Sequence, residues 1–119
     1  MSAEHTPGPW IFETVNTTSG ICHKIGPFPP KQEGGRPRHA CIYADYPSPY
    51  HPADQELEAN ARLIAAAPEL LDAVELVLAW FEAEDNHSKE PDFYKRLEMC
   101  RESEDAIRAV IAKVEGGAA

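Results

Sequence analysis

Hydrophobic and polar positions alternate along the first part of the chain, and the spacing then becomes helical. The segment Trp10–Val15 alternates, so Trp10 and Phe12 share one face of an extended strand. The segments Ile21–Ile25 and His39–Ala44 continue this pattern and are rich in strand-forming residues. We therefore predict a three-stranded antiparallel meander whose apolar face needs a cover.

Two proline-rich segments interrupt this pattern. The first, residues 26–38, reads GPFPPKQEGGRPR, and its prolines cannot donate hydrogen bonds to a sheet. It predicts an exposed loop that is long for a hairpin. The second, DYPSPYHP at residues 45–52, precedes the helical half of the chain.

The helical half begins with Leu57, Ala61 and Ile64 at positions i, i+4 and i+7, and Asp54 is a suitable N-cap. A longer stripe follows, consisting of Leu70, Val74, Val77, Leu78 and Phe81. Pro68 lies between the two stripes. Inside one continuous helix it would cost about 3 kcal/mol, whereas in the first turn of a new helix its missing N–H costs nothing. The spacing thus predicts two helices, at about 54–66 and 68–83, with an extended Ala67 and a bend between them.

A polar connection at residues 82–92 leads to a third predicted helix. Ser88 or Glu90 is expected near its start, Pro91 in its first turn, and Gly116-Gly117 at its end. Its apolar stripe is Phe93, Leu97, Cys100, Ile107, Ile111 and Val114. This near-heptad spacing favours an antiparallel hairpin within the chain over self-association, although a homodimer stays an alternative.

These elements predict an α+β fold, with a small three-stranded antiparallel sheet followed by two to three helices packed on one face. The chain has 119 residues and a mass of 13.2 kDa, which suits a single domain over residues 1–119. Residues 1–50 form its β-rich part with proline and glycine loops, and residues 51–119 form an acidic helical part.

The net charge of −9 lies entirely in residues 51–119, because residues 1–50 carry four acidic and four basic side chains. Such an acidic half repels phosphates and argues against direct binding of nucleic acid. It favours either solubility alone or a surface that binds a basic partner.

Candidate chemistry is sparse. Cys22, His23, His39 and Cys41 are ligand types on neighbouring predicted strands, but Cys22 and His23 point to opposite faces and the spacing is not that of a zinc site. No catalytic or phosphate-binding motif occurs. We expect no enzyme activity, no catalytic residues, no cofactor and no metal. The absence of a signal peptide or long apolar run predicts free thiols in a reducing cytoplasm and no membrane contact.

The loop at residues 45–52 is a candidate contact surface, because tyrosines held on stiff, proline-rich loops are favoured interface anchors. Tyr43, Tyr46 and Tyr50 lie in or beside it. The alternative is that these rings fold down onto the edge of the sheet and cover it.

Two motifs carry a resemblance. The segment HTPGPW at His5–Trp10, followed by ANARLIAAAPELLDAVE at Ala59–Glu75, resembles a group of small phage and prophage accessory proteins. The resemblance implies a viral protein made in the cytoplasm of a bacterial host and implies no biochemical activity. It also implies that Trp10 anchors the core and that Leu63, Ile64, Leu70 and Leu71 are packing residues.

Small acidic phage proteins without enzyme activity often occupy a host defence protein. The leading hypothesis is therefore an inhibitor of anti-CRISPR type that binds a basic surface, with a CRISPR effector or another defence protein as its partner. Its predicted contact residues are Tyr46, Tyr50, Glu82, Glu84, Asp85, Glu90 and Asp92.

Two alternatives remain. One is a sponge that sequesters a defence signalling nucleotide, with the ligand-binding set Lys31, Arg36, Arg38 and Tyr43. The other is a structural or regulatory accessory protein of the phage with no defence target.

Overall fold

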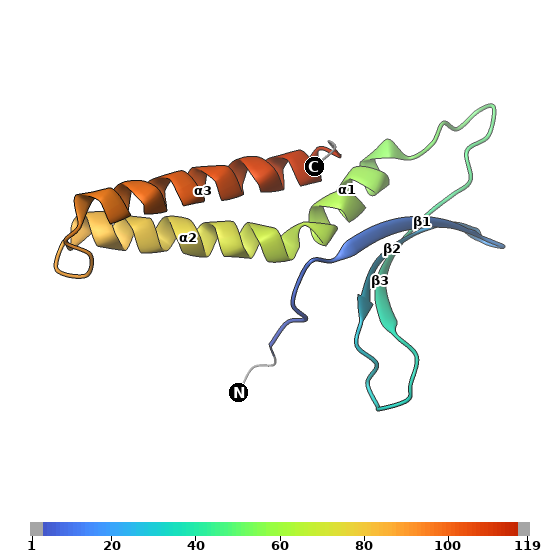
Figure 1. The fold of residues 1–119 in the computed structure, drawn as a ribbon. Coiled ribbons are helices and arrows are strands. Elements are labelled where there is room, and N and C mark those ends of the chain that lie inside the picture. Colours follow the sequence, from blue (N-terminus) through green and yellow to red (C-terminus); the bar gives the residue numbers. More distant parts are fainter. Residues whose placement is uncertain (1–3, 117–119) are drawn as a thin grey trace. The chain divides into compact units, whose positions relative to one another are not determined.

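A computed structural model describes residues 4–116, and it contains three strands followed by three helices (Figure 1). This arrangement confirms the predicted α+β class. The chain forms two compact units that divide between Ala66 and Ala67. The sheet and helix α1 make up the first unit, and helices α2 and α3 make up the second. The expectation of a single domain stays a prediction.

The sheet has the predicted meander topology, with each strand antiparallel to the next in the order β1-β2-β3. Its strands are β1 (Ile11–Thr17), β2 (Gly20–Phe28) and β3 (Arg38–Ala44). Two residues connect β1 to β2, and the register pairs Thr17 with Gly20. The alternating sequence pattern therefore gave the strand order and faces correctly.

Strand β2 extends further into the proline-rich segment than predicted. It runs through Pro27 to Phe28, which shortens the expected loop. The pairing with β3 shifts between Ile25 and Phe28, so β2 carries an extra residue there. Because a bulge leaves a residue outside the hydrogen-bond ladder, a proline is tolerated at this position.

Helix α1 (Gln55–Ala65) covers the apolar face of the sheet. Asp54 caps it as predicted, with its carboxylate Oδ1 accepting from the Leu57 N–H at 3.0 Å. The core between α1 and the sheet is formed by Ile25, Ala61 and Ala65, which are at most 1% exposed. Five partly buried residues pack around these, namely Trp10, Phe12, Phe28, Ala40 and Ile42.

The packing residues implied by the resemblance are partly wrong. Leu63 and Ile64 are 48% and 40% exposed, and Leu71 is exposed as well. The buried residues of this motif are mostly alanines: Ala61, Ala65 and Ala66 are at most 1% exposed, and Pro68 and Ala73 are buried as well. Small side chains let the α1 backbone approach the sheet closely, and the leucines beside them point elsewhere.

Helix α2 (Ala67–Asp85) begins one residue earlier than predicted. Pro68 lies in its first turn, as the sequence indicated, and Glu69 is an acidic residue in that turn. Ala67 is helical and not extended, which corrects the expectation for the residue before proline. The break falls on Ala66, whose N–H bonds to the carbonyls of Arg62 and Leu63 and so ends α1.

Helix α3 (Phe93–Val114) packs against α2 as an antiparallel hairpin (Figure 1). Its N-cap is Asp92, so Ser88 and Glu90 are not the cap and Pro91 lies before the helix. Gly116 follows its C-cap with a φ of +75°, as the predicted glycine stop requires, whereas Gly117 lies outside the described residues.

Two ion pairs fix the hairpin register. Glu84 lies 3.3 Å from Arg96 near the connection, and Glu69 lies 2.8 Å from Lys113 at the other end. Buried Ala73 and half-buried Val77 of α2 line one groove together with buried Val110 of α3, so these side chains lie where the two helices meet. The intramolecular hairpin is therefore confirmed.

Candidate functional site

Negative charge is concentrated in the second unit. Its sequence carries thirteen acidic and six basic residues, a net charge of −7. Helix α2 contributes six of these acidic residues and no basic residue. Helix α3, by contrast, carries five basic and four acidic residues. The acidic potential of this unit therefore originates mainly on α2 and at the end of the hairpin.

The predicted contact carboxylates at the hairpin end differ in their surroundings. Glu82 forms an ion pair with Lys89 at 3.4 Å, and both side chains are half exposed, so solvent screens this pair. Asp85 is exposed, and no salt bridge joins it to another described residue. Both carboxylates are thus available to a partner at little cost.

Glu84 has a structural role. Its carboxylate lies 3.3 Å from Nε of Arg96, whose side chain is 9% exposed. Nη1 of Arg96 also donates to the Glu90 carbonyl at 2.9 Å, and the guanidinium lies over the Phe93 ring. Removing Glu84 would leave a buried cation without its counter-charge, so this residue is less suited to partner binding.

Glu90 and Asp92 shape the start of α3. Asp92 accepts hydrogen bonds from the N–H groups of Tyr94 and Lys95, and Glu90 accepts one from the Asp92 N–H. Their charges face the positive end of the helix dipole, which stabilises them there. Both remain near the surface, but substitution of either also affects the helix start.

The tyrosine loop belongs to the first unit. The Tyr46 hydroxyl donates to the Thr17 carbonyl, so this ring is fixed against the sheet edge. Tyr50 is 89% exposed at the tip of the loop. Of the two interpretations of this loop, the sheet-edge cover fits Tyr46 and the exposed anchor fits Tyr50.

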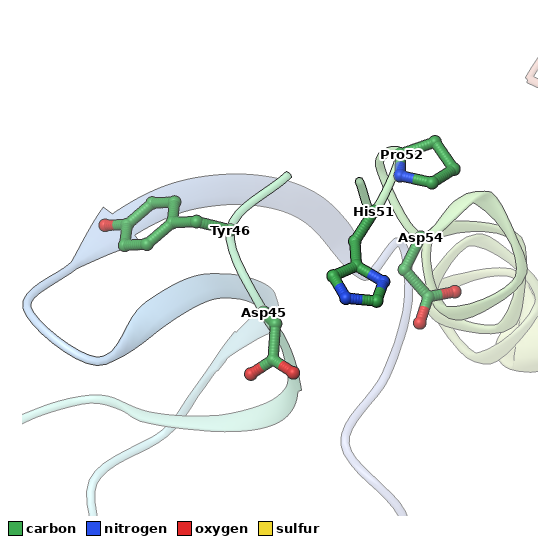
Figure 2. A pocket seen from close by; sticks show the side chains of 5 residues that line it. All are labelled: Asp45, Tyr46, His51, Pro52 and Asp54. Atoms are coloured by element: carbon green, nitrogen blue, oxygen red, sulfur yellow. The ribbon is translucent and has the colours of Figure 1, made fainter. Parts of the chain in front are cut away.

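A depression of about 340 Å³ lies beside the same loop, lined by Asp45, Tyr46, His51, Pro52 and Asp54. Figure 2 shows Tyr46 directed away from His51 and Asp54. The carboxylate of Asp54 is occupied in capping α1. The depression therefore presents the carboxylates of Asp45 and Asp54 and the imidazole of His51.

The alternative ligand-binding residues do not converge. Lys31 and Arg36 lie on the exposed loop between β2 and β3. Arg38 and Tyr43 are separated by an odd number of positions on β3, so they point to opposite faces. Arg38 donates to the Pro29 carbonyl at 2.8 Å and lines a shallow depression beside Trp10 and Phe28, which the sequence did not predict.

Two cysteines lie on neighbouring strands of the sheet, and of these Cys22 is buried whereas Cys41 is exposed. Cys22 pairs with Tyr43 across β2 and β3, on the face opposite His23. Burial raises the pKa of the Cys22 thiol, with a further contribution from its hydrogen bond with Cys41. Negative charge on Cys22 would in turn raise the pKa of Tyr43. Among the described residues, no group of three His, Cys, Asp or Glu side chains is placed to hold a metal.

One surface was not predicted as a site. An apolar groove of about 230 Å³ runs along the hairpin and is lined by Leu70, Ala73, Val74, Val77, Ile107, Val110 and Ile111. The periodic stripes of both helices were visible in the sequence. The sequence did not indicate which residues of each stripe are buried between the two helices and which stay exposed in the groove.

Comparison with protein families gives a match over almost the whole chain. A protein-family model described as Salmonella phage P22 protein Y8K6 matches residues 1–118. No curated protein and no solved structure matches the chain. Across residues 4–116, none of the helices is long and apolar enough to cross a membrane.

Proposed function

The chain belongs to the family of Salmonella phage P22 protein Y8K6, and from this premise we propose that it is a non-enzymatic binding protein that inhibits a host antiviral defence component. The phage origin implied by the two motifs agrees with the family. The protein would act in the cytoplasm of the infected bacterium. Its partner would be a host protein with a basic surface, such as a CRISPR effector.

The observation that carries the proposal is the placement of charge. The second unit has a net charge of −7, and α2 has no basic residue to offset its six carboxylates. Proteins that handle nucleic acid present lysine and arginine to phosphates, so an acidic helix of this kind competes for the same surface. Long-range attraction would also speed association at low salt.

The surroundings of the predicted contact residues support a smaller set as the proposed contacts. Glu82 and Asp85 present carboxylates at the surface without holding the fold, and Tyr50 is exposed in the other unit. Glu84, Glu90 and Asp92 are engaged in the hairpin and the α3 cap. We therefore assign partner contact first to Glu82 and Asp85. The nucleotide-sponge alternative receives less support, because Arg38 and Tyr43 point to opposite faces.

Plaque formation tests this proposal. Phage would be plated on bacteria whose CRISPR system targets it, with the chain expressed from a plasmid, and then on hosts carrying other defence systems. Wild-type chain should restore plaques on at least one host. The double variant Glu82→Lys, Asp85→Lys should lose this protection, because it reverses both accessible charges. The fold should persist, since a lysine at position 85 suits the C-terminal end of α2.

The matched control is Glu4→Lys, Glu33→Lys, which makes the same change in net charge at exposed positions of the first unit. It should protect the phage as well as the wild-type chain. Full protection by the α2 variant, or no protection by the wild-type chain on any host, would remove the proposal.

A further inference from the structure

The α2–α3 hairpin leaves a long apolar face uncovered. Val74 is 62% exposed and Phe81 is 52% exposed on α2, with Leu78 also exposed between them. These residues follow the spacing i, i+4, i+7 and therefore lie on one side of the helix. The exposed apolar residues of α3 are Phe93, Leu97, Ile107 and Ile111.

The groove shows that the two apolar stripes share one face of the hairpin. Val74 from α2 and Ile107 and Ile111 from α3 line it together, over a floor that includes Ala73 and Val110. Two helices cannot bury both the seam between them and a second stripe beside it. A common solution for such a hairpin is a four-helix bundle, in which two further helices cover the open face.

Charged residues flank this face asymmetrically. On α2, Glu75 lies four residues after Leu71 and three before Leu78, so it borders the apolar stripe on its outer side. On α3, the bordering residues are Arg101, four residues after Leu97, and Arg108, three before Ile111. One edge of the face is therefore acidic, and the other carries two arginines, of which Arg108 is paired at 2.6 Å with Glu104 of its own helix.

We propose that the open face of the hairpin binds the same face of a second copy of this chain, which forms a symmetric four-helix bundle. A twofold axis parallel to the helices places α2 of each copy against α3 of the partner. The acidic edge of one copy then meets the basic edge of the other along both sides of the interface. If α2 instead faced α2, acidic edges would oppose each other.

The ion pairs within the hairpin determine which charges meet. Pairing of Glu84 with Arg96 and of Glu69 with Lys113 places Glu75 at the level of residues 105–108 of α3. Rotation about an axis parallel to the helices preserves this level. Glu75 of one copy therefore lies near Arg108 of the partner subunit, and the two hairpin ends, with their Glu82 and Asp85, lie at the same end of the bundle.

The first test is the mass of the full-length chain in solution, measured by light scattering after gel filtration. The expected value is twice the chain mass of 13.2 kDa. Val74→Glu and Ile111→Glu should each give a monomer with unchanged helical circular dichroism, because both side chains are exposed in the single chain. Leu76→Glu is the matched control, since Leu76 is exposed on α2 outside the groove, and it should stay dimeric.

The second test addresses the pairing of α2 with α3. Glu75→Lys and Arg108→Glu should each weaken the homodimer, because like charges then meet twice across the interface. A mixture of the two variants should form heterodimers in excess of random pairing, as measured by native mass spectrometry. The ion pair of Arg108 with Glu104, at 2.6 Å, lies within one chain. Its loss in Arg108→Glu is the same in the monomer and in either dimer, so it cancels in the exchange between homodimers and heterodimers.

Several results would overturn the proposal. They are a monomeric wild-type chain at all concentrations, a Val74→Glu variant that remains dimeric, equal dissociation by Leu76→Glu, and random pairing of the charge variants. The test is independent of any defence partner, so loss of plaque protection and loss of dimerisation can be told apart.

Discussion

Gly20 opens β2 with a φ of +147°, a backbone conformation that residues with a side chain rarely adopt. A Cβ atom added there would lie 2.6 Å from the Ala44 carbonyl oxygen on β3. The glycine therefore serves both the turn after β1 and the close pairing of the strands. A side chain at this position would therefore disturb both the turn and the pairing of β2 with β3.

Replacing Gly20 with alanine should lower the free energy of unfolding by more than about 1 kcal/mol, because the backbone strain and the contact with β3 act together. Chemical denaturation followed by fluorescence measures the loss. Gly34→Ala is the control: Gly34 also has a positive φ of +79°, but no atom lies within 4 Å of its added Cβ. An equal or larger loss for Gly34→Ala would contradict the role assigned to the Ala44 contact.

Residue-level expectations succeeded where a period of two decides the outcome. Phe12, His23 and Ile25 point toward the helix-covered face because alternation along a strand leaves no other choice. The packing role that the resemblance implied for Leu63 and Ile64 was wrong, since close helix–sheet packing at this joint uses alanine. Distance between backbones is a tertiary quantity that a helical stripe does not encode.

At the level of elements, the start of α3 depends on one carboxylate. Asp92 Oδ1 accepts from the Tyr94 N–H at 2.9 Å and from the Lys95 N–H at 3.4 Å. The connection before it contains other residues that often cap helices. Of these, Asn86 accepts hydrogen bonds from Ser88 within the loop, and α3 begins only at Phe93. The sequence pattern placed Ser88 or Glu90 near the start of this helix and did not identify Asp92 as its cap.

Asp92→Ala should lower the free energy of unfolding by about 1 kcal/mol, because two N–H groups lose their acceptor. Asp92→Asn keeps an oxygen in the same place and should cost clearly less. Thermal unfolding monitored by circular dichroism compares the two. If asparagine destabilised as much as alanine, the carboxylate charge would matter more than the cap, and the assignment of Asp92 to the helix start would need revision.

The helix-forming segments were predictable because periodicity and Pro68 act locally. A proline in the first turn of α2 separates two stripes that would otherwise read as one long helix. The groove was not predictable, because the apolar stripe on each helix is wider than the part that packs against the other helix. Which part faces the neighbouring helix depends on the antiparallel register set by Glu84 with Arg96 and Glu69 with Lys113.

For the whole molecule, the expected single domain consists of two compact units of modest size, with one tryptophan in each. Chains of about 60 residues bury a smaller fraction of their surface than larger domains and are marginally stable alone. Charge distribution, by contrast, follows directly from the sequence: the acidic excess was assigned correctly to the helical half. Neither the size of the units nor the charge distribution identifies the partner. The contact residues predicted for it are divided between the two units.

The single-domain prediction can be tested with these tryptophans. Trp10 packs edge-on against Phe28 in the first unit, and Trp80 lies on α2 in the second. Fluorescence of Trp80→Phe reports the first unit, and that of Trp10→Phe reports the second. Both should give the midpoint found by circular dichroism for the same variant, because a cooperative domain unfolds in one step. Separate midpoints within one variant would identify two domains.

The buried alanines at the end of α1 bear on what proteins with the same motif would share. The motif NARLIAAAPELL contains Ala61, Ala65 and Ala66, which are at most 1% exposed. Its larger residues Leu63 and Ile64 are 48% and 40% exposed. In this chain, the small side chains of the motif set how closely α1 approaches the sheet. Proteins that share the motif would share the packing of this helix on the sheet. Their surfaces elsewhere, and therefore their binding partners, could differ.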